Sequence, residues 1–222
     1  MSVLLVGDLH GEIFWFRQAY QRAVDEGASA IIQVGDFGLM RENEHQFREV
    51  ATDFDLPFYF IDGNHDDCER WSNYEHVVAV FRSHNLFYVP RGTLLEVDNR
   101  KFLCVGGAAS IDKEIRLRNG WHWTPKENIS DELVENVLAK MEGVTVDAMI
   151  THAPPLSIAD RFFDSIEKIK FGVGLNWFDP NMKRIEHIWN KLNKPQLYCG
   201  HMHRVLDENG CRIININEFL LI

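Results

Sequence analysis

The chain has 222 residues, of which 45% are hydrophobic, and a formal net charge of −10. This size and hydrophobic content are ordinary for a globular protein with one large domain or two small ones. The negative charge and the lack of any run of Lys and Arg argue against an extended surface for nucleic acid. No apolar run approaches the length of a membrane span.

The N-terminal stretch MSVLLVGDLHG combines an apolar run with an early charge at Asp8. A secretory signal peptide has a basic n-region and a small-residue cleavage site, and this stretch has neither. We therefore interpret it as a first strand and expect a cytoplasmic protein. Because no linker, low-complexity tract or internal repeat interrupts the chain, we expect a single domain over residues 1–222. The four cysteines form no CxxC pair and are expected to be buried free thiols.

Five short apolar runs end in polar motifs, and each is typical of a strand that is covered on both faces. In chain order, SVLLV precedes Gly7-Asp8-Leu9-His10-Gly11, AIIQV precedes Gly35-Asp36-Phe37-Gly38, FYFI precedes Asp62-Gly63-Asn64-His65-Asp66, DAMIT precedes His152-Ala153-Pro154-Pro155, and QLYC precedes Gly200-His201-Met202-His203.

Helical patterns separate several of these runs. Apolar residues recur at helical spacing over 13–24, and 41–54 predicts a short solvated helix. Ser130 has the position of an N-cap, and Asp179 followed by Pro180 has the order of a cap and a first-turn proline. Alternating strands and helices predict an α/β fold with parallel pairing. In such sheets, functional sites form beyond the carboxyl ends of the strands.

Two other regions contain closely spaced apolar runs. The segments 86–107 and 203–222 predict hairpins, with Glu208-Asn209-Gly210 as one of the turns. We therefore expect a second, more antiparallel sheet that packs on the first.

The polar motifs supply oxygen and imidazole groups without a thiolate. This donor set suits a hydrolytic site with two metal ions. Each motif alone is also compatible with a simple polar turn, because Asn and Gly tolerate positive φ. The combination favours metal binding, since five independent turns at strand ends rarely all carry ligand chemistry. The residues concerned are Asp8, His10, Asp36, Asn64, His65, His152, His201 and His203.

The ordered set of motifs resembles the calcineurin-like metallophosphoesterases, whose pattern is Asp-x-His, Gly-Asp, Gly-Asn-His-Asp/Glu, His and Gly-His-x-His. The resemblance spans residues 7–203 and implies a four-layer α/β/β/α sandwich of two mixed sheets. It implies two divalent metal ions, with manganese expected and iron, zinc, nickel or cobalt as alternatives. One ion would be held by Asp8, His10, Asp36 and His203, and the other by Asp36, Asn64, His152 and His201, with Asp36 as the bridge.

The resemblance also implies a mechanism. His65 matches the family's histidine that faces the leaving group, and Asp66 is expected to orient its imidazole and favour the protonated form. Hydrolysis would proceed through attack by a hydroxide that bridges the metals, with His65 as the general acid.

The residues after Asp36 separate this chain from two branches of the family. Protein Ser/Thr phosphatases carry Gly-Asp-x-Val-Asp-Arg-Gly, and purple acid phosphatases place a tyrosine ligand where this chain has Leu39. We predict a small phosphodiesterase acting on nucleotide-like or cyclic phosphodiesters. A broad-specificity phosphomonoesterase or protein phosphatase is the alternative, and a non-catalytic metal-binding interaction module is an alternative of another class.

Two segments have open roles. The segment 106–130 either lines the substrate pocket or folds over its own tryptophans, and 157–181 is either a mobile cap or a plain connection. The substrate-binding residues expected in the first segment are Arg116, Arg118, Trp121 and Trp123.

Overall fold

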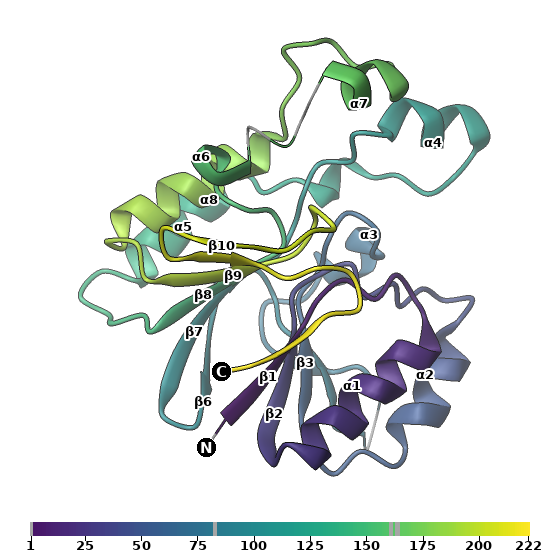
Figure 1. Ribbon diagram of the computed structural model, residues 1–222, viewed down its shortest axis with the longest axis vertical. Helices are drawn as coiled ribbons and strands as arrows, with labels where there is room; N and C mark the ends of the chain where they lie inside the picture. The colour runs from purple at the N-terminus through teal and green to yellow at the C-terminus, as the bar shows by residue number, and fades with distance from the viewer. Residues whose placement is uncertain (1, 82–83, 160–161, 163–164) are drawn as a thin grey trace.

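The computed structural model describes residues 2–81, 84–159, 162 and 165–222 (Figure 1). Within these ranges the strands form two six-stranded sheets. The sheets pack face to face, because one core cluster contains residues of both, including Val3 and Ile32 from one sheet and Phe102 and Ile150 from the other. The predicted sandwich of two mixed sheets is therefore confirmed.

The first sheet has the strand order β12-β1-β2-β3-β5-β4. Its central strands β1 (Ser2–Val6), β2 (Ala28–Gln33), β3 (Phe58–Phe60) and β5 (Leu86–Tyr88) are parallel. The edge strands β12 (Phe219–Leu221) and β4 (Val78–Ala79) pair antiparallel to β1 and β5.

The second sheet has the order β10-β11-β9-β8-β7-β6. Its strands β11 (Cys211–Ile213), β9 (Gln196–Cys199), β8 (Ala148–Thr151) and β7 (Arg100–Val105) are parallel. The edges β10 (Leu206–Glu208) and β6 (Thr93–Val97) are antiparallel.

The expectation of a second sheet that is more antiparallel than the first is wrong, because in both sheets only the edge strands pair antiparallel. The two predicted hairpins exist as β6–β7 and β10–β11, and Asn209 and Gly210 adopt the positive φ that their turn needs. However, β5 and β12 join the first sheet instead of extending these hairpins. The motif-bearing strands are consequently divided: β1, β2 and β3 belong to the first sheet, and β8 and β9 to the second.

Helices cover the outer faces of both sheets (Figure 1). On the first sheet lie α1 (Ile13–Asp25) and α2 (Glu44–Ala51), and on the second lie α5 (Asp131–Lys140) and α8 (Pro180–Lys191). The shorter helices are α3 (Cys68–Trp71), α4 (Lys113–Asn119), η1 (Pro125–Glu127), α6 (Leu156–Ala159) and α7 (Ser165–Lys170).

The predicted caps are confirmed at two helices. The side chain of Ser130 accepts a hydrogen bond from Leu133 N at 3.1 Å, and that of Asp179 accepts one from Asn181 N at 2.7 Å. The helix expected to be solvated, α2, instead buries Phe47 on its inner side. Among the described helices, none has the length and apolar character needed to cross a membrane. All four cysteines are buried free thiols, as predicted.

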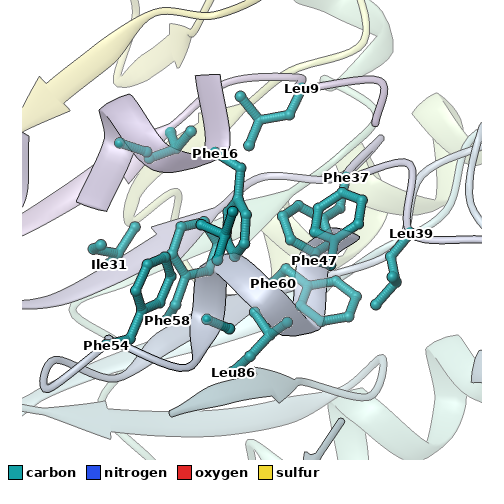
Figure 2. Packing of buried hydrophobic residues seen from close by; sticks show 14 of the residues in the cluster. Leu9, Phe16, Ile31, Phe37, Leu39, Phe47, Phe54, Phe58, Phe60 and Leu86 are labelled. Carbon is teal, nitrogen blue, oxygen red and sulfur yellow. The ribbon is translucent and has the colours of Figure 1, made fainter. Parts of the chain in front are cut away.

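An aromatic cluster beneath α1 and α2 anchors the loop that follows β2. Figure 2 shows Phe37 among Phe16, Phe47 and Phe60, and its ring centroid lies 4.5 Å from that of Phe60. Phe37 is fully buried. Burial of this ring fixes the backbone on the carboxyl side of Asp36, the residue that the next subsection places at the centre of the site.

Candidate metal centre

The polar motifs of both sheets meet at the carboxyl ends of their strands. The loops after β1, β2 and β3 carry Asp8, His10, Asp36 and Asn64, and those after β8 and β9 carry His152, His201 and His203. Candidate ligands from the two sheets therefore lie close together at one edge of the sandwich.

The first group is Asp8, His10, Asp36 and His203, whose ligand atoms all lie within 4.8 Å of one another. His203 Nε2 lies 3.2 Å from Asp8 Oδ2 and 3.0 Å from His10 Nε2. His10 Nε2 also lies 3.8 Å from Asp36 Oδ2. The two carboxylates are buried. Two buried carboxylates facing imidazoles form a donor set that fits a divalent cation.

The second group shares Asp36 with the first. His152 Nε2 lies 3.2 Å from Asp36 Oδ1 and 3.3 Å from Asn64 Oδ1. The rings of His152 and His201 lie 5.0 Å apart between centroids. Asp36 thus presents Oδ2 to one group and Oδ1 to the other. This arrangement is what a bridging carboxylate requires.

Several of these side chains are held by further contacts. His152 Nδ1 lies 3.0 Å from the carbonyl oxygen of Val34, and His201 Nε2 lies 3.7 Å from Asp179 Oδ2. Asn64 Nδ2 donates to Ser110 Oγ at 3.3 Å. Such contacts select the ring orientation or the amide orientation that a metal needs. The Asn64 contact leaves Oδ1, the better ligand, directed at His152.

Glycines in the motifs provide space for ligands from neighbouring motifs. A Cβ atom on Gly63 would lie 2.2 Å from Asp36 Oδ1 and 2.6 Å from His152 Nε2. A Cβ on Gly35 would lie 2.5 Å from His152 Nδ1. Side chains cannot pack this closely. The glycine of one motif is therefore needed for the ligand of another.

The backbone at four of the candidate ligands is in the left-handed region. The φ angles are 48° at His10, 54° at Asp36, 67° at His201 and 48° at His203. Non-glycine residues adopt this conformation at a cost, and such residues cluster at functional sites.

The charges at the centre suit metal binding. Although burial works in the opposite direction, His152 and the other nearby histidines hold the pKa of Asp36 well below its usual range. The reciprocal attraction to Asp36 raises the pKa of His152 to about 10 against the effect of burial. Burial lowers the pKa of His201 to about 3, and His152 adds to this shift. Asp36 is therefore ionised and His201 neutral. A cation bound at Asp36 would replace the attraction between Asp36 and the protonated ring of His152, so metal binding would release that proton.

A family model described as calcineurin-like phosphoesterase matches residues 1–205. The chain belongs to the calcineurin-like phosphoesterase family. It is a metal-dependent phosphoric ester hydrolase. No curated protein matches the chain at a significant level.

Solved structures share the fold of this phosphoesterase at low sequence identity. The protein TT1561 of Thermus thermophilus is 15% identical with a TM-score of 0.59, over 97% of this chain and 89% of that one. A dimetal phosphatase from Danio rerio is 10% identical with a TM-score of 0.58, over 100% of this chain and 91% of that one.

In this phosphoesterase, the described hydrogen bonds of the Asp66 side chain are with backbone amides. Its buried carboxylate accepts hydrogen bonds from the backbone amides of Gly63 at 2.7 Å, Gly38 at 2.6 Å and Phe37 at 3.2 Å. It therefore ties the loop after β3 to the loop after β2. None of the described contacts joins this carboxylate to the ring of His65.

The described contacts of the His65 ring are with Arg116 and His10, and the His65 backbone N–H donates to Asp36 Oδ1 at 2.8 Å. The ring of His65 lies 4.8 Å from that of His10 between centroids. Arg116 Nη2 lies 2.7 Å from His65 Nε2 and 3.0 Å from Nδ1. A guanidinium beside an imidazole disfavours the protonated ring. Arg116, and not Asp66, is thus the residue described against the ring, and a role of Asp66 in orienting His65 and favouring its protonation stays a prediction.

Two adjoining cavities of the phosphoesterase share Asn64, His65 and Asp112. The first, about 330 Å³, is also lined by Asp36, Ile111, Phe171, His201, Met202, His203 and Arg204. The second, about 350 Å³, is also lined by Met40, Asp66, Arg116, Trp121 and His122. A larger cavity of about 610 Å³, lined by residues of 138–146 and 191–193, contains none of the motif residues.

The structure brings only part of the expected substrate-binding set to these cavities. Arg116 and the half-exposed Trp121 line the second cavity. Arg118 is exposed, and Trp123 donates to Glu127 Oε1 at 3.0 Å beneath Lys113. Neither is among the described residues that line the two cavities.

Sequence reasoning did not single out other lining residues, including Asp112, Phe171 and Arg204. They come from irregular segments, in which no periodic pattern marks the direction of a side chain. Phe171 shows that the segment 157–181 contributes to the first cavity, whereas its residues 160–161 and 163–164 lie outside the described ranges.

Proposed function

We propose that this phosphoesterase hydrolyses phosphodiesters at a centre of two divalent metal ions. Asp8, His10, Asp36 and His203 would hold one ion, and Asp36, Asn64, His152 and His201 the other. The observation that carries the proposal is the position of Asp36, whose two oxygens face the two ligand groups. Manganese is the ion we expect, with iron, zinc, nickel or cobalt as alternatives, because oxygen and imidazole donors accept all of them.

Two ions in such a centre supply Lewis acidity and an activated water for attack on phosphorus. The chain itself supplies the proton for the leaving group. His65 is exposed and lines both cavities beside the proposed metal ligands. Its ring can therefore reach the ester oxygen of a substrate that is bound at the metal centre. We assign it the transfer of a ring-nitrogen proton to the departing oxygen, a role worth about 10²–10⁴-fold in rate. The guanidinium of Arg116 disfavours protonation of His65, and the negative charges of Asp36 and of the substrate offset this effect.

The two cavities support a preference for diesters. Because they share Asn64, His65 and Asp112, a phosphoryl group near His65 can extend one ester arm into each. Trp121, His122 and Met40 give the second cavity apolar and stacking surfaces that suit a nucleobase. Arg116, the cation in that cavity, is paired with Asp112 at 2.8 Å. It therefore adds little net positive charge for the second negative charge of a monoester.

A phosphomonoesterase is the second candidate, and one observation favours it. Arg204 lines the first cavity beside His201 and His203. Its Nε donates to the carbonyl oxygen of Met202 at 3.2 Å, and a guanidinium in that position can meet an additional phosphoryl oxygen.

The substrate we propose is thus a small phosphodiester, such as a cyclic nucleotide or a dinucleotide. A cytoplasmic location stays a prediction.

Two measurements on the purified chain test the proposal. Metal analysis after dialysis should give two divalent ions per chain. The kcat/KM for bis-p-nitrophenyl phosphate should exceed that for p-nitrophenyl phosphate at saturating Mn²⁺. A clear preference for the monoester would overturn the diester assignment and favour the role of Arg204. A stoichiometry of one ion would overturn the shared role of Asp36.

A further inference from the structure

Helix α4 has an unusual inner side. Arg116 is its buried residue, whereas the neighbouring Leu117 is 50% exposed. A short surface helix normally turns apolar side chains inward and leaves its cations in solvent. Burying a guanidinium is costly unless it is paired and hydrogen-bonded. The reversed pattern indicates that Arg116 is placed for its contacts rather than for packing.

Those contacts reach the loop after β3. Nη1 of Arg116 donates to the backbone carbonyl oxygen of Asn64 at 3.0 Å. Nη2 lies against the ring nitrogens of His65 at 2.7 and 3.0 Å. One side chain therefore contacts both the backbone of a proposed metal ligand and the ring of the proposed acid.

Asp112 holds the guanidinium in this position. It is the N-cap residue of α4, where an aspartate side chain ordinarily accepts a hydrogen bond from the first turn of its helix. Here its side chain makes no capping hydrogen bond, and Oδ1 accepts from Arg116 Nε at 2.8 Å instead. The helix thus lacks its cap while Asp112 is used to fix Arg116.

We propose that Arg116, held by Asp112, is the positioning residue for His65. It takes the place that sequence analysis assigned to Asp66, whose oxygens are used by backbone amides. Arg116 acts through His65: it fixes the ring so that a nitrogen faces the leaving-group oxygen. The kinetic part of this inference rests on the proposed function, because it needs a phosphodiester substrate with a measurable turnover.

A double-mutant cycle separates this role from simple substrate binding. The variants are Arg116→Gln, His65→Ala and the combination of both. Substrates are thymidylyl-thymidine, whose alkoxide leaving group needs a proton, and bis-p-nitrophenyl phosphate, whose nitrophenolate does not. Arg116→Gln should lower kcat for the dinucleotide by about 10²-fold, the effect of misplacing a reacting group by about 1 Å. The loss for the nitrophenyl ester should be much smaller, and the double variant should resemble His65→Ala alone.

Three results would overturn the inference. In the first, the double variant loses kcat by the product of the two single losses. In the second, Arg116→Gln lowers kcat equally for both substrates. In the third, Arg116→Gln loses bound metal to an extent that accounts for the fall in kcat. Arg184→Gln is the matched control, because Arg184 Nε donates to Asp131 Oδ1 at 2.7 Å in an exposed pair between α8 and α5. Arg184→Gln should leave kcat for both substrates unchanged.

A second measurement does not depend on turnover. The ring ¹⁵N resonances of His65, assigned with His65→Ala in the zinc-loaded chain, should shift in Arg116→Gln and, to a smaller extent, in Asp112→Asn. Arg116→Lys keeps the positive charge but not the planar guanidinium with its two donor nitrogens, and it should also shift the ring resonances of His65. Unchanged resonances would overturn the inference. If the wild-type chain hydrolysed no phosphodiester, the proposed function would fail, and the resonances would still decide the role of Arg116.

Discussion

Gly63→Ala is the sharpest test of how the metal centre is built. The substitution adds one methyl group, and Gly63 is not among the glycines with positive φ, so its effect is mainly steric. The new Cβ would lie 2.2 Å from Asp36 Oδ1 and 2.6 Å from His152 Nε2. Nonbonded atoms pack at about 3.5 Å or more, so these two ligand atoms must separate from the loop by about 1 Å.

The expected loss follows from that displacement. Metal–ligand distances tolerate changes of only about 0.2 Å. Disturbing even an outer partner of a ligand costs about 10–100-fold in affinity, so displacing two ligands should weaken Mn²⁺ binding by about 100-fold or more. Overpacking alone should destabilise the metal-free chain by about 1–3 kcal/mol. The chain should therefore still fold but no longer retain metal.

Calorimetric titration with Mn²⁺ and thermal denaturation in chelator measure these two effects separately. Gly174→Ala is the control, because its added Cβ meets no atom within 4 Å and Gly174 is not among the positive-φ glycines. The reasoning is refuted if Gly63→Ala binds two ions with unchanged affinity.

Three further substitutions test other parts of the structure. Asp36→Asn should remove charge from both ligand groups, so the ion content measured after dialysis should fall at both sites and activity should be lost. His65→Ala should keep both ions while kcat for dinucleotides falls by about 10²–10⁴-fold, with a smaller loss for nitrophenyl esters. Arg91→Met should lower the unfolding free energy by about 3–5 kcal/mol in urea denaturation, because it leaves buried Asp62 without the guanidinium that contacts it at 2.5 and 3.0 Å.

Each of these has an outcome that contradicts it. Retention of two ions by Asp36→Asn would exclude a bridging role. Equal losses for both leaving groups in His65→Ala would exclude proton donation. A change below about 1 kcal/mol in Arg91→Met, the net worth of one ordinary hydrogen bond, would mean that Asp62 remains satisfied by Tyr88, whose hydroxyl donates to it at 3.1 Å.

The sequence predicted what is encoded locally. A strand that ends in glycine and a ligand-type residue can be recognised from consecutive letters, and the structure gathers the expected side chains from all five such ends. The assignment of each to a metal ion stays a prediction. The helix caps at Ser130 and Asp179 were also predictable, because capping depends on residues two or three positions away.

The features that the sequence did not predict are pairings that short segments do not encode. An apolar run such as 86–88 does not indicate which strand it joins, so β5 was assigned to the wrong sheet. Asp66 follows His65 directly, yet its carboxylate turns to the backbone of another loop. Arg116 lies far along the chain from His65, and only the packing of α4 against the loop after β3 brings them together.

The division of the ligands between the two sheets has a consequence for how the molecule matures. Asp8 lies near one end of the chain and His203 near the other, and yet their side chains lie 3.2 Å apart. A nascent chain that has formed β1, β2 and β3 already carries Asp8, His10, Asp36 and Asn64, but neither proposed ligand set is complete until β9 has docked. High-affinity metal uptake should therefore be a late event, coupled to assembly of the whole sandwich. Bound ions would then draw the folding equilibrium toward the finished molecule, because they bind it in preference to unfinished states.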